Sequence, residues 1–343
     1  MTMASMYYVG LDVHKKTISF CVQDERGTIV EEGQIRARPT TLSGWARQLP
    51  APWMGAMEAT LFTGWIYDHL TMQGAAVKVA HPAQVKAIIA AKKKSDRIDA
   101  RTLANLLRCR LLPEVQLLPG ELRQLRRILR YRTLLVSQTT RMKNKIAGLL
   151  MESGVDYQAR RLHGKQYFHQ LLQELEGVPD SVVELLQMSR QTVDYLSGLE
   201  QKLRRGLLTH PHLRERVELL QSIPGVGVIV ALTWALEVGP IERFASVRQA
   251  ISYCGLCSAQ RESAGKMKRG PISKQRNKHL QRVLVEAAKL APRYSPHLAG
   301  IYQKERQRGN WNRATLAVAR RLVAYLLAVD RRQTPFVSAS SAQ

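Results

Sequence analysis

The order of predicted secondary structure in the first third of the chain constrains the fold more than any other feature. Residues 6–37 contain apolar, β-forming runs separated by a DERG turn, and they predict three consecutive strands. Residues 40–110 predict helices that alternate with two further strands, the first of which ends at Glu58. A three-strand meander followed by alternating helices and strands is the order of the ribonuclease-H-like (RuvC-like) fold, an α/β domain. We predict this domain over residues 6–112.

This order also predicts where four acidic residues meet. In such a sheet the first and fourth strands are neighbours, so Asp12 on the first strand is expected to lie near Glu58 at the end of the fourth. Asp96 and Asp99 are three residues apart, and on a helix they share one face. A helix packed against that edge of the sheet would bring all four carboxylates together.

Four carboxylates at one point suit a divalent metal. Hard oxygen ligands favour Mg²⁺ or Mn²⁺, and such ions activate a nucleophile and stabilise a leaving oxygen at phosphorus. Asp12 lies in an otherwise apolar strand, where an unpaired carboxylate is costly. Taken singly, Asp96 is also compatible with a helix N-cap, and Glu58 with a surface acid. Three residues before the helix are expected to contact the phosphate backbone: Lys92, Lys93 and Lys94.

The charge balance indicates a polyanionic partner. The chain has 52 Lys and Arg against 27 Asp and Glu, a formal net charge of +25. Nucleic acid is the usual partner of so basic a chain, and a solvated basic surface is the alternative. No signal peptide or apolar run of about 18 residues predicts a membrane span. Cys254 and Cys257 have the spacing of zinc ligands, but no second pair completes a site, so buried thiols are favoured.

Residues 119–206 predict an elongated helical spacer. Apolar residues recur at helical spacing from Glu121 to about Met151, and a second helical region runs from about 168 to 206. The interpretation is a coiled coil that also joins subunits, with a compact bundle as the alternative. The first helix carries eight basic residues and one acidic residue between Glu121 and Lys145. Four of them are expected to contact nucleic acid: Arg123, Arg126, Arg127 and Arg130.

Residues 215–329 predict a third, mostly helical region, followed by a disordered tail over 330–343. It opens with a helix end, the sequence PGVG and another helix, which is the helix-hairpin-helix pattern. Gly225 and Gly227 would let the backbone and a helix N-terminus approach a phosphate. An ordinary glycine-capped turn between two helices is the alternative.

A second basic segment covers residues 261–282, with eight basic residues and one acidic residue. Ser263 lies in the sequence Ser-Ala-Gly-Lys, which predicts a flexible, exposed turn. The residues expected to bind phosphate beside it are Lys266, Lys268, Arg269 and Lys274. Spacing alone predicts no Ser-His-Asp arrangement, so a nucleophilic Ser263 would need activation by cations or by a metal from elsewhere. Most serines in basic loops only contact phosphate.

The motifs GLDVHKKTISF, MEAT, AHPAQVKAIIAAKKKSDRIDARTLA, LQSIPGVG and YCGLCSAQRESAGKMKRGPISKQRNKHLQRVL occur here in that order. In sequence and spacing they resemble the IS110 family of insertion-sequence transposases, relatives of the Piv DNA invertase. The resemblance covers roughly residues 6–325.

The resemblance implies a RuvC-like domain with a DEDD metal site at Asp12, Glu58, Asp96 and Asp99. It also implies a C-terminal serine that attacks DNA and forms a covalent phosphoserine link. Ser263 is the best match, with Ser258 and Ser273 as alternatives. Members of the family act as oligomers that combine the acidic site of one subunit with the serine of another. They are guided by an RNA that the element encodes, so a bacterial cytoplasmic, nucleoid-associated protein is expected.

Two departures from the family pattern concern the second basic segment. The family often has Ser-Ser-Gly or Ser-Gly-Gly where this chain has Ser263-Ala264-Gly265 after Glu262. It often has glycine where this chain has Arg276. Neither departure removes a predicted catalytic group, although Glu262 places a carboxylate beside the predicted nucleophile.

The resulting hypothesis is a DNA transposase that mobilises its own element, with Mg²⁺ at the acidic site, Ser263 as nucleophile, and DNA, guide RNA and further copies of itself as partners. A site-specific DNA invertase of the same chemistry is the nearest alternative. A RuvC-like structure-specific nuclease needs the carboxylates and no serine. A nucleic-acid-binding protein without activity is disfavoured, because binding alone would select against acids near phosphate.

Overall fold

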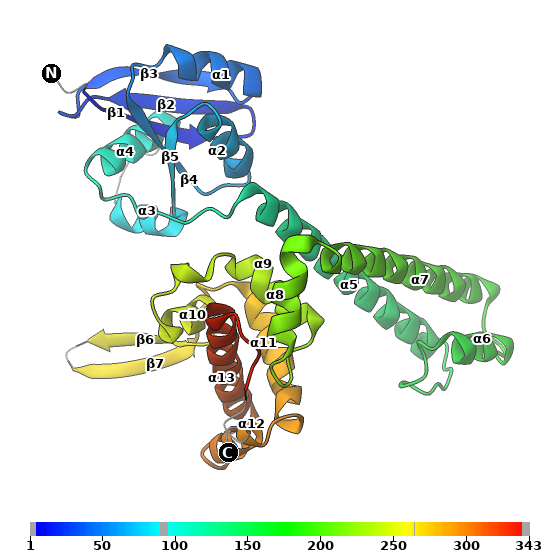
Figure 1. Ribbon diagram of the computed structural model, residues 1–343. Helices are drawn as coiled ribbons and strands as arrows, with labels where there is room; N and C mark the ends of the chain where they lie inside the picture. Colours follow the sequence, from blue (N-terminus) through cyan, green and yellow to red (C-terminus); the bar gives the residue numbers. More distant parts are fainter. Residues whose placement is uncertain (1–4, 90–94, 264, 338–343) are drawn as a thin grey trace. The chain divides into compact units, whose positions relative to one another are not determined.

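The chain forms two units. The structure, a computed structural model, describes residues 5–89, 95–263 and 265–337. One unit spans Met1–Gly120 and the other Glu121–Gln343. The first is a mixed α/β unit and the second is mostly helical, and the labels of both are those of Figure 1.

The predicted element order of the first unit is confirmed. A five-stranded sheet has the order β3-β2-β1-β4-β5, with β1 antiparallel to β2 and parallel to β4. The first and fourth strands are therefore neighbours, as the sequence predicts. The elements are β1 (Tyr7–Val13), β2 (Thr17–Gln23), β3 (Ile29–Arg36), α1 (Pro39–Gln48), β4 (Trp53–Glu58), α2 (Thr63–Thr71), β5 (Ala76–Ala80), α3 (Pro82–Ile88) and α4 (Asp96–Arg108).

Helices cover both faces of this sheet. Leu11 and its alternate neighbours on β1 pack into one apolar cluster with Trp45 of α1 and Ile66 of α2. Ala56 of β4 packs into a second cluster with Leu103 and other residues of α4. Because side chains alternate along a strand, Gly10 and Asp12 point to the α4 face when Leu11 points to the other. The acidic residue on β1 therefore lies on the same face as α4.

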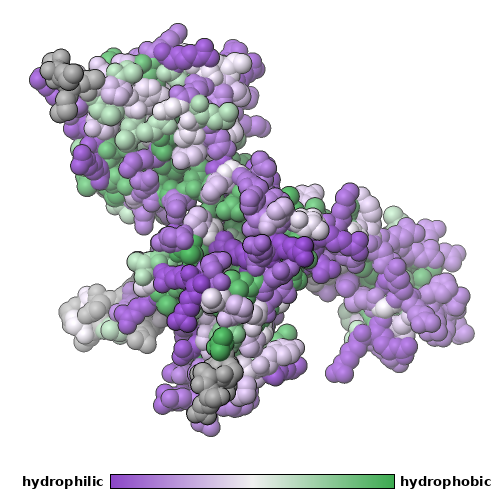
Figure 2. Space-filling view, viewed as in Figure 1, coloured by the Kyte–Doolittle hydropathy of each residue, from purple (hydrophilic) through white to green (hydrophobic). Residues whose placement is uncertain are grey.

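The second unit begins with a long helical hairpin, which we call the arm. It consists of α5 (Gly120–Glu152), α6 (Lys165–Gln173) and α7 (Asp180–Leu208). The 33 residues of α5 make a helix about 50 Å long. Leu150 of α5, Phe168 of α6 and Leu186 of α7 share one buried cluster, and Arg132 of α5 pairs with Glu200 of α7 at 2.6 Å. Hydrophilic residues dominate the visible face of the arm in Figure 2.

The remaining elements are a group of helices around α9 and the hairpin of β6 and β7, which projects from that group (Figure 1). They are α8 (Pro211–Gln221), α9 (Val228–Val238), a 3-10 turn (Ile241–Arg243), α10 (Val247–Tyr253), β6 (Ser258–Ser263), β7 (Lys266–Ile272), α11 (Lys278–Leu290), a 3-10 turn (Ala291–Arg293), α12 (Pro296–Gln307) and α13 (Trp311–Arg332). Eight of the 11 residues of α9 are buried, which explains its nearly continuous apolar sequence. Among the described residues, no helix combines the length and apolar character that crossing a bilayer requires.

The strands β6 and β7 pair as an antiparallel hairpin, and Gly265 turns the chain between them, within the segment predicted as a turn. One feature of the second unit differs from the sequence-based expectations. The helix α13 continues to Arg332, three residues into the segment predicted to be disordered. Asp330 explains the extension, because its buried carboxylate accepts hydrogen bonds from Arg216 at 2.7 Å and from the Trp234 indole at 2.9 Å.

Candidate active site

Gly10 sets the distance between the acidic strand and the acidic helix. A Cβ atom at Gly10 would lie 1.9 Å from the carbonyl oxygen of Ala100 and 2.5 Å from the amide nitrogen of Ala104. Only glycine allows α4 to approach β1 so closely, because any side chain would collide with helix backbone. The first turn of α4 is thereby held over the end of β1, where Asp12 lies.

A salt bridge also fixes the same helix to β3, the edge strand of the sheet. Arg101 of α4 donates two hydrogen bonds to Glu32 of β3, at 2.7 and 2.8 Å. Arg97 pairs with the same carboxylate. The bidentate geometry restricts rotation as well as separation of the helix. Ser95, rather than Asp96, caps the helix, since its hydroxyl accepts the hydrogen bond of the Ile98 amide. Asp96 is therefore free of the capping role that was its alternative explanation.

Asp12 and Asp96 converge on a histidine. The Nε2 atom of His14 lies 3.1 Å from Asp12 Oδ2 and 3.3 Å from Asp96 Oδ1. Asp12, His14 and Asp96 are the one group of three or more potential metal ligands that lie together among the described residues. The sequence analysis missed His14, although a spacing of two on a strand puts it on the same face as Asp12.

The charge of Asp99 also acts on Asp12, although Asp99 is not among the three grouped ligands. Burial raises the pKa of Asp12 above its ordinary value. The nearby charge of His14 lowers this pKa, and the charges of Asp96 and Asp99 raise it. The balance is a carboxylate whose charged form is disfavoured by its surroundings. A cation at this point would relieve that penalty, and the oxygen donors suit a hard divalent ion.

Glu58 lies on the neighbouring strand at the corresponding level. The pairing of β1 with β4 ends at Leu11 and Met57, so Asp12 and Glu58 are the next residues along the two strands. Neighbours in register point to the same face, which here is the face of α4. Glu58 is half-buried. Its chain direction after the strand is held by Thr63, whose hydroxyl donates to the Glu58 carbonyl oxygen at 3.0 Å.

Ser263 ends β6 near the tip of the hairpin and is exposed. It pairs in register with Lys266, and Gly265 turns the chain with φ of +74°. Ser258 is exposed at the base of the hairpin, and Ser273 is half-buried after it. Ser263 is thus the most peripheral of the three candidate serines. Lys274 is exposed, whereas the side chains of Lys266, Lys268 and Arg269 and the residues Lys92, Lys93 and Lys94 lie outside the description of the structure.

The CGLC sequence is part of the apolar core. Cys254 is fully buried among the residues around α9, and burial raises its pKa to about 12, with Cys257 adding to the rise. A zinc ligand is a thiolate, which this environment suppresses. The interpretation of Cys254 as a small buried hydrophobe is confirmed.

The four arginines of α5 that are predicted to contact nucleic acid have different environments. Arg127 is exposed and Arg123 half-buried. Burial, followed by the charge of Arg130, lowers the pKa of Arg126. Arg130 donates two hydrogen bonds to Glu237, at 2.7 and 2.8 Å, and this carboxylate is fully buried within α9. Arg130 therefore has a structural partner that its spacing does not reveal.

The two glycines of the PGVG turn also differ. Gly225 has φ of +84°, and a Cβ there would lie 2.6 Å from the Cβ of Ala291. Helix packing thus requires this glycine whether or not phosphate approaches. A Cβ at Gly227 would meet open space. Gly227 is the N-cap residue of α9, and no side chain caps the helix there.

Comparison with known protein families gives two matches, one in the N-terminal part of the chain and one in the C-terminal part. Residues 9–154 match a transposase domain of the DEDD type from IS110 elements. Residues 217–303 match the transposase domain of the IS116/IS110/IS902 family. The DEDD type indicates a divalent metal, and the Asp12, His14 and Asp96 group has the ligands to bind one. Ser263 lies within the second matched region.

Relatives align along most of the chain. A probable family 20 transposase of Pseudomonas aeruginosa is 26% identical over 293 residues, which cover 83% of this chain and 84% of the relative. The transposase for insertion sequence IS1328 of Yersinia enterocolitica is 25% identical over 294 residues, 84% of each chain. The transposase for IS1111A of Coxiella burnetii is 26% identical over 352 residues, 98% of this chain and 92% of the relative. This chain therefore carries two transposase domains of the IS110/IS116/IS902 family and aligns along most of its length with insertion-sequence transposases.

Proposed function

We propose that the protein cuts and rejoins DNA by transferring a strand to Ser263, with the reacting phosphate held at a metal site formed by Asp12, Glu58, Asp96 and Asp99. The observation that carries the proposal is the convergence of Asp12 and Asp96, which come from different elements and lie 3.1 and 3.3 Å from one imidazole nitrogen. The family supports it, since transposases act on DNA. A RuvC-like fold for the first unit is part of the proposal.

The acidic cluster fits Mg²⁺ or Mn²⁺. Its donors are carboxylate oxygens, and Asp12 carries a raised pKa because burial and neighbouring acids disfavour its charge. When bound, the divalent ion would neutralise phosphate charge and favour attack at phosphorus. Asp12 and Glu58 would be held rigidly by adjacent strands, and Asp96 and Asp99 by the first turn of a helix that Gly10 seats on the sheet.

Ser263 would act as the nucleophile. Its Oγ atom would lose a proton to a base and form a bond to a backbone phosphorus, while a deoxyribose oxygen leaves and takes up a proton. The bond energy is conserved in the phosphoserine ester. The hydroxyl of another strand end could then attack the same phosphorus and release the serine, so exchange needs no external energy source. The exposed position of Ser263 near the end of β6 supports access to a large substrate.

Nucleic acid would bind along the basic surfaces of both units. The net charge of +25 and the exposed Arg127 of α5 support such binding. We extend the proposal to an RNA encoded by the element as the guide. The protein would then need to recognise backbone and shape more than base sequence.

A homo-oligomer is the remaining part of the proposal. Leu185, Met188 and Tyr195 of α7 are 47%, 62% and 68% exposed. Their spacing of three and seven residues puts them on one stripe of the helix. An apolar stripe on the arm is suited to pair with another copy of the chain. Because the acidic cluster and Ser263 belong to different units of the chain, a complete site could draw them from different subunits.

A covalent-trapping assay tests the proposal. The protein would be incubated with Mg²⁺, DNA from the ends of its element and RNA transcribed from the element's flanks, then run on a denaturing gel. The wild type should give a protein–DNA adduct, and Ser263→Ala and Asp12→Asn should each abolish it. Ser258→Ala and Ser273→Ala are matched controls that should retain the adduct.

Each contrary result identifies a different error. Cleavage without adduct in Ser263→Ala would indicate a metal-dependent nuclease of the RuvC kind. An adduct lost in Ser258→Ala or Ser273→Ala instead would move the nucleophile. Adduct formation without RNA would remove the guide. An adduct at the borders of an invertible segment, and none at element ends, would favour the invertase.

A further inference from the structure

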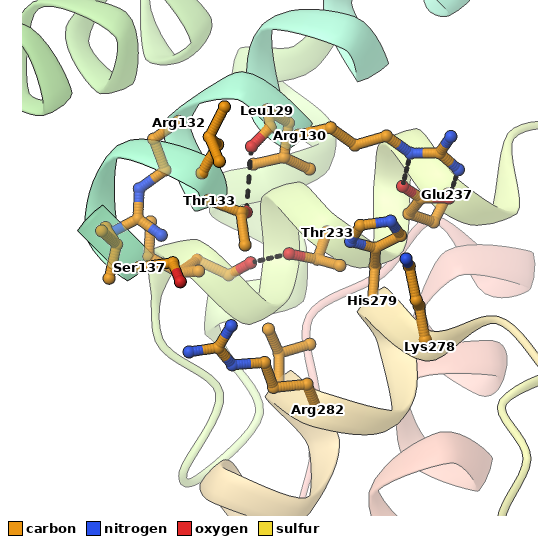
Figure 3. A pocket seen from close by; sticks show the side chains of 14 residues that line it. Leu129, Arg130, Arg132, Thr133, Ser137, Thr233, Glu237, Lys278, His279 and Arg282 are labelled. Atoms are coloured by element: carbon orange, nitrogen blue, oxygen red, sulfur yellow. Dashed lines mark hydrogen bonds and ion pairs between the residues drawn. The ribbon is translucent and has the colours of Figure 1, made fainter. Parts of the chain in front are cut away.

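A pocket of about 480 Å³ lies in the second unit, away from the acidic cluster and from Ser263 in sequence. Three helices form it: α5 supplies one wall, α9 the floor and the first turns of α11 the opposite wall (Figure 3). Its volume suits part of a nucleotide rather than a protein segment. The sequence pattern predicts a nucleic-acid contact for one of its residues, Arg130, and gives Lys278 and Arg282 no individual role.

The cations of the pocket fall into two classes. Arg130 is neutralised by Glu237 at 2.7 Å, and Arg132 by Glu200 at 2.6 Å. Lys278 and Arg282 form no hydrogen bond or ion pair with any residue in the described ranges, and both project from α11 into the pocket (Figure 3). The paired arginines build the wall. Lys278 and Arg282 leave the pocket with a net positive charge that no described residue neutralises.

Two other side chains of the pocket, those of Ser137 and His279, can donate hydrogen bonds to a bound anion. The hydroxyl of Ser137 on α5 has no partner among the described residues. Thr133 and Thr233 donate to carbonyl oxygens of their own helices, at 3.0 and 2.6 Å. Burial lowers the pKa of His279, which keeps its ring neutral near pH 7 and able to donate one N–H. Ser137 and His279 therefore add donors that match the oxygens of a phosphate, whereas the hydroxyl protons of Thr133 and Thr233 are already used.

The backbone of α11 does not supply the site. Asn277 caps this helix and accepts the amides of His279 and Leu280, at 3.1 and 3.2 Å. Those amides are therefore already satisfied, and anion binding falls to the side chains. The positive end of the 13-residue helix still favours an anion beside Lys278.

The pocket continues toward the PGVG turn. A second cavity of about 840 Å³ shares Ile229, Arg282 and Val283 with the first and is lined at its other end by Gly225 and Gly227. Lys278 and Lys289 mark the two ends of this path along α11. Eleven residues of helix span about 16 Å, or roughly five base steps at 3.4 Å each. The path therefore has the length of a short strand segment.

We propose that this pocket binds one backbone phosphate of a nucleic-acid strand, with Lys278, Arg282 and Ser137 as its contacts and the apolar wall of Ile229 and Val283 against the adjoining sugar. The strand would continue past Arg282 toward Gly227. This inference rests on the proposed function and names one binding contact of the same enzyme.

The test measures binding of a short single-stranded DNA, and of an RNA of the same sequence, to the full chain over about 50 to 200 mM salt. The double variant Lys278→Gln, Arg282→Gln should weaken binding roughly tenfold and lower the salt slope by about 1. Lys304→Gln with Arg308→Gln is the matched control, because it removes the same charge at the same spacing from an exposed part of α12. An equal loss in both double variants would overturn the proposal.

A second variant tests whether the strand enters the pocket or only contacts its rim. Ser137→Trp fills the cavity without changing charge and should weaken binding as the double variant does, with an unchanged circular dichroism spectrum. Unaltered binding by a folded Ser137→Trp protein would show that strands do not enter. The DNA and RNA arms show which strand the pocket takes.

The trapping assay keeps this inference distinct from the proposed function. A wild-type adduct together with unchanged binding by the double variant would overturn the pocket alone. Absence of any adduct, together with the expected change in salt slope, would overturn the Ser263 chemistry and leave the phosphate site standing.

Discussion

Asp12 and Glu237 are both carboxylates shielded from water, one in each unit. Their surroundings shift the two pKa values in opposite directions. Burial opposes ionisation at each. At Glu237, hydrogen bonds from Arg130 and Asn277 outweigh burial and hold the pKa below its ordinary value. At Asp12, two further acids add to the effect of burial, and the pKa is raised.

The difference separates a structural acid from an acid of the proposed metal site. A buried charge that the protein fully compensates stabilises the fold or orders it. A half-buried charge left among like charges lowers the stability of the fold. Functional sites keep such charges because their chemistry requires them. Glu237 therefore explains how α5, α9 and α11 are held together, while a cation bound beside Asp12 would offset the repulsion among the acids there.

The largest expected effect is at Glu237. Glu237→Ala should lower the free energy of unfolding by about 3 kcal/mol, the lower end for a broken buried pair, because Arg130 can turn toward water. Urea unfolding would measure it. Glu242→Ala is the control, since Glu242 is exposed and should change stability by less than about 0.5 kcal/mol. Equal effects at the two positions would contradict the structural role of Glu237.

The same pair predicts an acid-sensitive contribution. Because the folded pKa of Glu237 lies below its ordinary value of 4.5, its contribution is complete above that value and is lost as pH falls through the folded pKa. The stability gap between wild type and Glu237→Gln should thus be constant near neutral pH and close below about pH 4.5. A gap that widens in acid would reverse the assigned sign.

The second prediction concerns metal at Asp12. Mg²⁺ at a hundredfold excess over its dissociation constant should stabilise the wild type by about 2.7 kcal/mol, seen as a rise in Tm. Asp12→Asn should lose this rise and Glu237→Gln should keep it. A rise that survives in Asp12→Asn would place the metal elsewhere.

Without metal, Asp12→Asn is expected to increase stability rather than to remove a stabilising effect. Asp12→Asn should raise stability by about 0.5–1 kcal/mol at neutral pH, because it removes one of several like charges. The gain should vanish in acid, where Asp12 itself becomes protonated, since a raised folded pKa costs stability as pH rises. Asp24→Asn is the control of opposite sign, because the Thr28 amide lowers the pKa of Asp24. Destabilisation by Asp12→Asn would contradict the electrostatic account.

Much of the first unit could be predicted because its signals are local. Apolar alternation defines each strand, and the strand order alone puts Asp12 beside Glu58. Gly10 carries a further signal, since glycine within an apolar strand predicts close approach of another backbone. The proximity of Asp12 to Asp96 follows from these features. The proposed catalytic use of Ser263 rests on resemblance.

What could not be predicted depends on distant or weak signals. Glu237 and Arg130 are 107 residues apart, and a lone acid within an apolar helix predicts a partner without naming it. The hairpin of β6 and β7 has no alternating apolar residues, so strand pairing there leaves no pattern. Asp330 looks like part of a polar tail until Arg216 and Trp234 are seen to bind it.

The smallest predicted effect is at His14, and it refines the acidic site most. His14→Gln should change stability by less than about 0.5 kcal/mol, because the imidazole is half exposed and its ion pairs are screened. Mg²⁺ prefers oxygen ligands, so the Mg²⁺-dependent rise in Tm should persist, whereas Zn²⁺ suits imidazole and should bind more weakly. Calorimetric titration of both ions would measure the two affinities, with His81→Gln, an exposed histidine of the same unit, as the control. Loss of Mg²⁺ binding in His14→Gln alone would make the imidazole a direct ligand of the ion, and the site would then be one of histidine and carboxylates rather than of carboxylates alone.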